Sequence, residues 1–336
     1  MQMTNKRMLV IRLSALGDVA MTIPAIYSLA KKYPQLHIDV VTRKFFARLF
    51  INAPGNVEVH GIDFNGDEYK GYLGTLRLLR KLGELKPDYV ADLHNVLRSW
   101  IIDWYFRAKG VKVVMVDKLR SARKDVLRHK IAQPSFIDRY ADVFAQLGYP
   151  VELTFQSLFE MDKPAIPLEI SYPAVGIAPF ARYYNKTYPP SMMKAAAEKL
   201  AADGYNVYLF GGRGKEAEEL AHWQASNDRC ISLAGRFTLE EELALMNKMN
   251  LMISMDSANQ HMAALAGTKV LSIWGSTTPE CGFLGYHQND SDVLCLHLEC
   301  QPCTVAGSPE CPLGHLNCFN GISPNMIVEK VKSLIG

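Results

Sequence analysis

The sequence has little cysteine and no long apolar run. Seven cysteines among 336 residues are too few for a small domain held together by disulfides. No window approaches the roughly 18 uninterrupted apolar residues of a membrane-spanning helix. Only Met8 to Ile11 separates Lys6 and Arg7 from Arg12, whereas a secretory signal needs an apolar run of about 7–15 residues. We therefore expect a cytoplasmic protein without stable disulfides.

The composition is that of a folded protein with a sizeable core. Apolar residues make up 49% of the chain and charged residues 21%, which excludes a disordered chain and a collagen-like repeat. At roughly 100–200 residues per domain, a length of 336 residues indicates two domains.

Charge is unevenly distributed along the chain. The net charge is +3, but residues 1–150 carry 24 Lys and Arg against 14 Asp and Glu, and residues 151–336 carry 13 against 20. Such asymmetry indicates that the basic half meets an acidic partner, which could be nucleic acid, anionic lipid or an acidic small molecule. A solvated basic surface is the alternative. Because no RNP-type, zinc-finger or helix-turn-helix signature is present, we expect no nucleic acid partner.

Strand-like and helix-like segments alternate along the first half of the chain. Residues 8–13 and 37–42 are typical of buried strands, and they flank a turn at 14–18 and a helix at 19–32. Strand, helix and strand in succession indicate a parallel sheet. The alternation continues with strands at 89–93 and 111–116, a basic and partly helical segment at 118–130, and helices at 96–108 and 137–146.

A proline-containing stretch, residues 148–173, separates this series from a second one and is interpreted as the interdomain connection. The second series has strands at 174–178, 206–210, 251–255 and 269–274, and helices at 191–202, 216–226, 239–250, 258–266 and 324–335. We predict two doubly wound Rossmann-like α/β domains that face a cleft, residues 1–165 and 166–336. The last helix is a candidate to pack back on the first domain.

Ligands of open α/β sheets bind outside the carboxyl ends of the strands, so the turns after strands should hold the functional residues. Asp18 follows the first strand, either as a helix cap or as a reactive carboxylate. Ser257 and His261 belong to a run that opens a helix after a strand, where free N–H groups favour an anion such as phosphate. The alternative there is a capped core helix. Lys186 also follows a strand and is either a phosphate partner or an ordinary surface lysine.

The glycine-rich turn at residues 211–216 matches no nucleotide fingerprint. The sequence Gly211-Gly-Arg-Gly-Lys-Glu216 lacks the Gly-Lys-Ser/Thr ending of a P-loop. It also lacks the full Gly-x-Gly-x-x-Gly spacing of a dinucleotide site. Its glycines still allow a ligand to approach the backbone closely.

Four cysteines gather late in the chain, with His297 and His315 nearby. They are Cys300, Cys303, Cys311 and Cys318. A Cys-x2-Cys pair in a cytosolic chain indicates metal or redox chemistry more often than a disulfide. A structural zinc ion is therefore one interpretation, and thiols without metal are the other.

Three motifs together resemble glycosyltransferase family nine, the ADP-heptose:lipopolysaccharide heptosyltransferases. They are Ile11-Arg-Leu-Ser-Ala-Leu-Gly-Asp-Val-Ala-Met-Thr-Ile-Pro-Ala25, Ser254-Met-Asp-Ser-Ala-Asn-Gln-His-Met-Ala-Ala264 and Ile273-Trp-Gly-Ser-Thr-Thr-Pro279. The stretch from Cys300 to Cys318 looks like a cysteine-rich loop found in part of the family. The similarity runs from about Met8 to about Val331.

This resemblance implies a GT-B fold and transfer of a heptose from ADP-heptose to the inner core of lipopolysaccharide, with inversion of the anomeric centre. By resemblance, Asp18 is the general base on the acceptor hydroxyl. The residues that would hold the donor are Lys186 at its phosphates, Glu216 near the adenosine ribose, Asp256 at its sugar, and Ser257, Ala258 and His261 along the pyrophosphate and sugar. The chain departs from the family with Ala181-Arg182 in the phosphate loop and with Ala258 where glycine is frequent.

The implied chemistry agrees with the residues. One carboxylate can take the acceptor proton, and a helix N-terminus with Lys186 can stabilise the leaving diphosphate, so no metal or other cofactor is required. The anionic lipopolysaccharide core and lipid A would meet the basic half, at the inner face of the inner membrane. The first candidates for this contact are Arg43, Arg98, Arg120 and Arg123. Another nucleotide-sugar donor, or a non-catalytic glycan- or nucleotide-binding homologue, are the alternatives.

Overall fold

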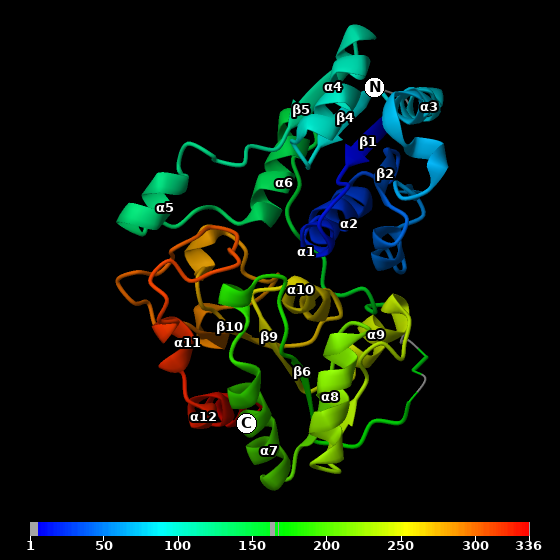
Figure 1. Ribbon diagram of the computed structural model, residues 1–336. Coiled ribbons are helices and arrows are strands. Elements are labelled where there is room, and N and C mark those ends of the chain that lie inside the picture. Colours follow the sequence, from blue (N-terminus) through cyan, green and yellow to red (C-terminus); the bar gives the residue numbers. More distant parts are fainter. Residues whose placement is uncertain (1–5, 162–164, 167, 336) are drawn as a thin grey trace. The chain divides into compact units, whose positions relative to one another are not determined.

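The computed structural model describes residues 6–161, 165–166 and 168–335 and divides into two compact units (Figure 1). The first unit comprises the chain up to Arg120 together with Phe136–Leu158, and the second comprises Ser121–Ser135 and Phe159–Gly336. The chain therefore leaves the first unit at Leu158, where the sequence analysis places the boundary at residue 165. The structure also places residues 121–135 in the second unit, so a single boundary along the chain cannot separate the two units.

The first unit is built on a five-stranded parallel sheet. Its strands are β1 (Arg7–Ile11), β2 (His37–Arg43), β3 (Val57–Ile62), β4 (Tyr89–Asp92) and β5 (Lys112–Met115), in the order β3-β2-β1-β4-β5. The chain runs outward from β1 to β3 and then returns to β4 on the other side of β1. The point where the order reverses, between β1 and β4, is where a doubly wound sheet leaves a crevice for ligands.

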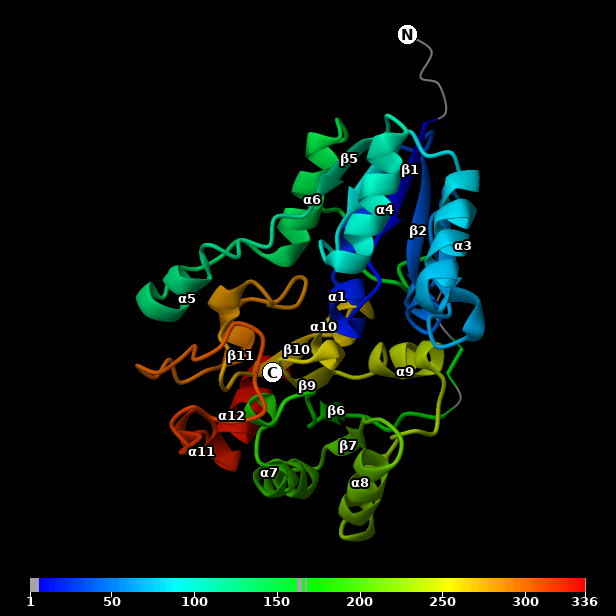
Figure 2. The same cartoon turned by 45° about the horizontal axis from the view of Figure 1, so that its top comes forward.

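Helices cover this sheet, and two of them share one face (Figures 1 and 2). The helices are α1 (Leu16–Ala20), α2 (Ile23–Lys32), α3 (Gly71–Glu84), α4 (Leu97–Ala108) and α6 (Phe136–Gln146). Leu78 and Leu82 of α3 and Ile102 and Phe106 of α4 pack with Leu9, Ile11 and neighbouring strand residues into one core. The helices α2 and α6 contact each other. The sequence patterns predict neither β3 nor α3.

The second unit is built on a six-stranded parallel sheet. Its strands are β6 (Ala174–Ala178), β7 (Asn206–Leu209), β8 (Cys230–Ser232), β9 (Leu251–Met255), β10 (Val270–Ile273) and β11 (Val293–Leu294), in the order β11-β10-β9-β6-β7-β8. Here the order reverses between β6 and β9. Both units are therefore doubly wound, which confirms the predicted fold class.

The helices of the second unit include the last helix of the chain. They are α5 (Arg123–His129), α7 (Pro190–Ala202), α8 (Lys215–Ala225), α9 (Leu239–Met246), α10 (Ala258–Leu265), α11 (Asn317–Asn320) and α12 (Pro324–Ile335). The helix α12 packs against α7, and Lys332 Nζ lies 3.1 Å from Asp203 Oδ2. The last helix therefore packs within the second unit, because its apolar residues Ile327, Val328 and Val331 join the core of that unit. Its packing on the first domain stays a prediction.

Residues 121–135 are held in the second unit by hydrogen bonds. Gln133 N donates to the carbonyl of Glu280 at 2.8 Å, and Lys130 Nζ donates to the carbonyl of Glu299 at 2.9 Å. Within the described ranges, we find no helix with both the length and the apolar character needed to cross a bilayer.

Candidate active site

The loop after β1 holds a carboxylate in a fixed position. Asp18 lies in the first turn of α1, and its Oδ2 is 2.9 Å from Nη2 of Arg12 and accepts a 3.0 Å hydrogen bond from the Ala15 amide. Asp18 is therefore not the N-cap, which is Ala15, but its side chain does bond the N-cap amide. Arg12 is buried and also donates to the carbonyl of Leu93 at 2.6 Å. This pairing fixes the carboxylate while leaving its side chain 27% exposed.

Residues after β4 complete this edge of the sheet. Asp92, at the end of β4, accepts hydrogen bonds from the amides of His94 and Asn95 and from Ser99 Oγ. These bonds shape the turn that carries His94, whose Nε2 lies 3.2 Å from Ser14 Oγ. Asp18 and His94 therefore stand at the switch point between β1 and β4.

Burial and positive charge set the protonation states around Asp18. Burial lowers the pKa of His94 to about 3, and the charges of Arg12 and Lys118 lower it further. Burial also lowers the pKa of Lys118 to about 8, with Arg12 and Arg120 acting in the same direction. His94 is neutral at pH 7 and is a weak base. Because His94 is also buried, Asp18 is the better placed group to take a proton from a substrate hydroxyl.

Of the four arginines predicted to meet the acceptor, three lie in the first unit. Arg43, at the end of β2, and Arg98, on α4, both lie over the ring of Phe64, with guanidinium-to-centroid distances of 5.9 and 4.5 Å. Arg120 donates to the carbonyl of Asn95 at 2.9 Å. Arg123 opens α5, which belongs to the second unit, so the structure does not place it with the other three.

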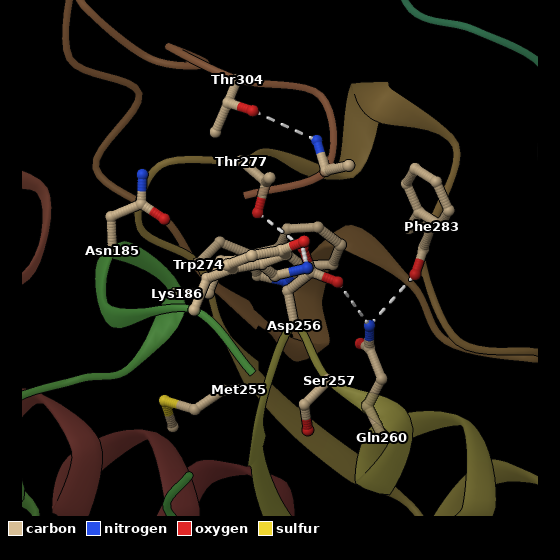
Figure 3. Close-up of polar contacts among 12 residues, drawn as sticks. Asn185, Lys186, Met255, Asp256, Ser257, Gln260, Trp274, Thr277, Phe283 and Thr304 are labelled. Atoms are coloured by element: carbon tan, nitrogen blue, oxygen red, sulfur yellow. Dashed lines mark hydrogen bonds and ion pairs between the residues drawn. The ribbon is translucent and has the colours of Figure 1, made fainter. Parts of the chain in front are cut away.

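A second cluster of polar groups surrounds Asp256, directly after β9. Its Oδ2 lies 2.6 Å from Lys186 Nζ and accepts a 2.6 Å hydrogen bond from Thr277 Oγ1. Its Oδ1 accepts a 3.3 Å hydrogen bond from Gln260 Nε2. Figure 3 shows these three side chains converging on the carboxylate from separate segments of the chain. Lys186 follows β6 and Asp256 follows β9, so this cluster stands at the switch point of the second sheet.

The helix α10 begins beside this cluster. Ser257 is its N-cap and its Oγ accepts a 3.3 Å hydrogen bond from the Asn259 amide. Ala258 is the first helical residue, and His261 is buried one turn further on. The remaining free N–H groups of the first turn and the helix dipole favour an anion here. Ser257 is therefore a helix cap, and its role at an anion site stays a prediction.

The buried polar atoms of the second unit that lack a hydrogen-bond partner within the described part of the chain include two in or next to the Asp256 cluster. They are Ser276 Oγ, next to Thr277, and Oε1 of Gln260. Buried polar atoms are nearly always hydrogen-bonded, so each exception needs an explanation, such as a catalytic role or a bound water or ion. These atoms can therefore bond to a substrate.

Glu216 lies at the same edge of the sheet, one strand further out. It is in the first turn of α8, after β7, which pairs with β6. Its Oε2 accepts a 2.7 Å hydrogen bond from the amide of Gly212. The carboxylate closes the glycine-rich turn, and its role near a ribose stays a prediction.

The cysteine-rich loop braces the Lys186 segment. The side chain of Asn185 donates to Ser308 Oγ at 2.6 Å and accepts from the Ser308 amide at 2.9 Å. Ser276 O accepts from the amide of Cys303 at 2.9 Å. A Cβ added to Gly307 would lie 2.5 Å from Cδ of Lys186. The loop therefore positions residues on both sides of the Asp256 cluster.

The four late cysteines are all free thiols. Burial raises the pKa of Cys303, with Cys311 and Cys300 adding to it, and burial raises that of Cys318 to about 12. In residues 6–161, 165–166 and 168–335, the one group of three ligand atoms within 4.8 Å of one another is His37, Asp39 and Glu58. The four thiols lie close enough to affect one another's pKa, and the zinc hypothesis stays a prediction.

The group around Asp39 is an ion-pair network rather than a metal site. Burial alone would raise the pKa of Asp39, but hydrogen bonds from Arg7 and His60 lower it to about 2. Arg7 bonds both carboxylate oxygens, through Nε and Nη2. A metal ion would have to displace this guanidinium.

Sequence reasoning identified Asp18, Lys186 and Asp256 but missed several of their partners. Arg12, His94 and Lys118 surround Asp18, and Thr277 and Gln260 bind Asp256. A signal for Arg12 was available, because a charged residue that continues an apolar strand is buried with a partner. Nothing in the sequence singles out Gln260.

Known proteins resemble this chain in sequence and in structure. The family model of glycosyltransferase family 9 (heptosyltransferase) matches residues 75–313. Lipopolysaccharide heptosyltransferase 1 of Pseudomonas aeruginosa is 23% identical, with 98% of each chain covered. Among solved structures, the family 9 glycosyltransferase of Veillonella parvula is 20% identical with a TM-score of 0.74, covering 100% of this chain and 98% of that one. E. coli heptosyltransferase WaaC with ADP is 18% identical with a TM-score of 0.69, covering 98% and 99%.

These likenesses establish the class and then the family. Two doubly wound domains with this likeness define the GT-B fold. Because the family model covers more than half of the chain, the chain belongs to glycosyltransferase family 9 (heptosyltransferase).

Proposed function

We propose that this enzyme transfers a heptose from ADP-heptose to the inner core of lipopolysaccharide, with inversion at the anomeric carbon. The observation that carries the proposal is the Lys186–Asp256–Thr277 cluster beside the N-terminus of α10, which suits a sugar diphosphate. The names of the relatives support the choice of heptose and of lipopolysaccharide.

In the proposed reaction, an acceptor hydroxyl attacks the anomeric carbon of the donor. Its proton passes to the Asp18 carboxylate as the new glycosidic bond forms. The bond from the anomeric carbon to the phosphate oxygen breaks on the opposite side, and ADP leaves with the bonding electrons. Arg12 keeps the carboxylate in position during this step.

The leaving diphosphate gains negative charge as the bond breaks. Lys186 and the first turn of α10 are the groups that stabilise this charge. Among the residues that the structure describes, the hydroxyl of Ser276 and the amide oxygen of Gln260 have no hydrogen-bond partner, and they are proposed to bond to donor hydroxyl or phosphate groups. No metal ion is required by this arrangement.

The acceptor is proposed to be lipid-linked and anionic. Arg43, Arg98 and Arg120 supply positive charge in the first unit, whose half of the chain is the basic one. Such an acceptor would bring the enzyme transiently to the inner face of the inner membrane. Arg123, on the second unit, is proposed as an additional contact.

Calorimetry with ADP, and with UDP and GDP as controls, tests the donor. We expect ADP to bind best, and Lys186→Ala to weaken ADP binding by about 10- to 100-fold because a charge-assisted contact with phosphate is lost. Lys194→Ala is the matched control, since Lys194 pairs with Glu198 on α7 of the same unit. It should bind ADP like the wild type.

The alternatives are separable by the same titration. Preference for UDP or GDP would replace ADP-heptose by another nucleotide sugar. Absence of binding by all three nucleotides, with no turnover, would favour a non-catalytic homologue. Equal ADP binding by the wild type and Lys186→Ala would remove Lys186 from the phosphate site.

The late cysteines are proposed to bind a structural zinc ion that draws Cys300, Cys303, Cys311 and Cys318 together, since metal binding can fold a loop around itself. Metal analysis of protein purified under reducing conditions tests this. We expect close to one zinc per chain, and none in the Cys300→Ser/Cys303→Ser variant. Zinc-free wild-type protein would leave the loop as a thiol-containing brace only.

A further inference from the structure

The outward face of α4 is apolar. Leu97, Trp100, Ile101 and Trp104 are spaced i, i+3, i+4 and i+7, which places them along one side of the helix. They are 75%, 40%, 47% and 78% exposed. The opposite side of α4 already packs on the sheet. Because α4 has apolar residues on its solvent side as well as on its buried side, we expect the exposed side to bind a partner.

The neighbouring helix extends this surface. Tyr72, Leu73 and Leu76 of α3 are 77%, 64% and 43% exposed, and α3 contacts α4 on the same face of the sheet (Figure 2). We call these seven residues of α3 and α4 the α3–α4 ridge. It contains half of the large apolar side chains that the described part of the chain exposes. Scattered exposure would need no explanation, but a gathering of this kind does.

Positive charge flanks the ridge. The exposed basic residues of these two helices are Arg77, Arg80, Lys81, Arg98 and Arg107. The one exposed acid within α3 and α4 is Glu84, which lies 3.5 Å from Arg80. The exposed Asp67 and Glu68 come just before α3, where Asp67 lies 2.9 Å from Lys70. Asp103 of α4 is buried. The surface thus combines apolar and cationic groups.

We propose that the α3–α4 ridge inserts into the interface of an anionic lipid bilayer and docks the first unit there. Tryptophan and tyrosine are enriched at the level of the headgroups, leucine and isoleucine extend into the acyl boundary, and flanking arginines meet lipid phosphates. Arginine also lets its apolar stem lie along the ridge while its guanidinium reaches the headgroups.

A bilayer fits better than a second copy of the chain. A symmetric dimer through this face would bring the flanking arginines of two copies toward each other, with few acids to compensate them. An anionic bilayer supplies the opposite charge. The choice of a lipid partner rests on the lipid-linked acceptor of the proposed function, whereas the ridge itself is independent of the donor.

Vesicle co-sedimentation tests this proposal. The probes are vesicles of phosphatidylcholine with 30% phosphatidylglycerol, in comparison with phosphatidylcholine alone. We expect the wild type to bind the anionic vesicles, and Leu97→Ser/Trp104→Ser to lower the partition coefficient at least tenfold. The matched control is Leu313→Ser/Met326→Ser, which removes exposed apolar side chains from the second unit. This variant should bind like the wild type, and unfolding temperatures should agree.

Tryptophan fluorescence gives a second readout. Trp100 and Trp104 are exposed, whereas Trp223 and Trp274 are buried. Brominated lipid should therefore quench wild-type emission, and should quench Trp100→Phe/Trp104→Phe far less. That variant keeps the apolar bulk and remains bound.

Three results would overturn the proposal: no binding by the wild type, equal binding by the ridge and control variants, or a wild-type dimer that the ridge variant converts to a monomer. Activity on a soluble acceptor without acyl chains distinguishes failure of the docking proposal from failure of the proposed function. Loss of docking leaves that activity unchanged, whereas failure of the proposed function shows as absent turnover in the wild type with vesicle binding intact.

Discussion

Nζ of Lys186 lies 2.6 Å from Oδ2 of Asp256, and the two side chains are only 14% and 5% exposed. The same carboxylate oxygen accepts from Thr277. The cation proposed to meet the donor diphosphate is therefore already paired inside the protein. Asp256 holds Lys186 in position and compensates its charge at the same time.

The substitution Asp256→Asn separates these two effects. Without the carboxylate, Lys186 presents an uncompensated charge, so ADP should bind as tightly as to the wild type or tighter, as calorimetry would show. The free energy of unfolding should fall by about 3 kcal/mol, because a nearly buried charge loses its partner. Turnover of ADP-heptose should also fall. Much weaker ADP binding in a folded variant would contradict this account.

Asp18→Asn tests the base. The amide keeps the shape of the side chain and its hydrogen bond from the Ala15 amide, but it cannot take a proton. We expect kcat to fall by at least about 100-fold, with ADP binding nearly unchanged. Asp142→Asn, an exposed acid of the same unit, is the matched control. If kcat of Asp18→Asn equalled that of the control, another group would have to be the base.

Gly307→Ala tests whether the cysteine-rich loop positions Lys186. A Cβ at residue 307 would lie 2.5 Å from Lys186 Cδ and 2.6 Å from a ring carbon of Tyr183, so the lysine stem must move. We expect ADP binding to weaken about tenfold. Gly314→Ala separates this effect from backbone strain, since Gly314 also has a positive φ, of +70°, but open space around it. Equal affinities of the two variants would exclude the positioning role.

The sequence predicts buried strands better than it predicts a partly exposed strand or a helix that contains glycine. Apolar, β-branched runs such as residues 8–11 and 251–255 indicate buried parallel strands, and they are found as β1 and β9. By contrast, β3 has exposed and half-buried residues, and α3 contains Gly74 and Gly83. Glycine is unfavourable within helices. At Gly74 the backbone of Tyr69 approaches too closely for a Cβ, a tertiary contact that local patterns do not reveal.

The same limit applies to the site. Asp18, Lys186 and Asp256 follow strands, so the rule for doubly wound sheets predicts their edge of the sheet. The pairing of Lys186 with Asp256 depends instead on strand order, because β6 and β9 are neighbours although more than seventy residues separate them. The α4 part of the α3–α4 ridge has the apolar spacing of a helix, but a sequence does not say which of two apolar faces is buried.

Asp103→Asn tests a buried acid of α4 that interacts with Asp92 at the end of β4. Burial raises the pKa of Asp103 from 3.8 to about 8, and the charge of Asp92 and a hydrogen bond to it act in the same direction. The folded state therefore binds this proton more tightly than the unfolded state. The stability contributed by Asp103 is fully present below about pH 4, declines as the pH rises, and is lost above about pH 8.

Asparagine cannot ionise, and its side-chain N–H can still donate to Asp92. The variant should therefore be more stable than the wild type by on the order of 2 kcal/mol at pH 8, and the difference should shrink toward pH 4. Urea unfolding at pH 4.5, 6, 7 and 8 measures this. Asp142→Asn should change stability little at any of these values, because its side chain is exposed. A constant difference between Asp103→Asn and the wild type across this range would mean that Asp103 does not hold a proton in the folded state.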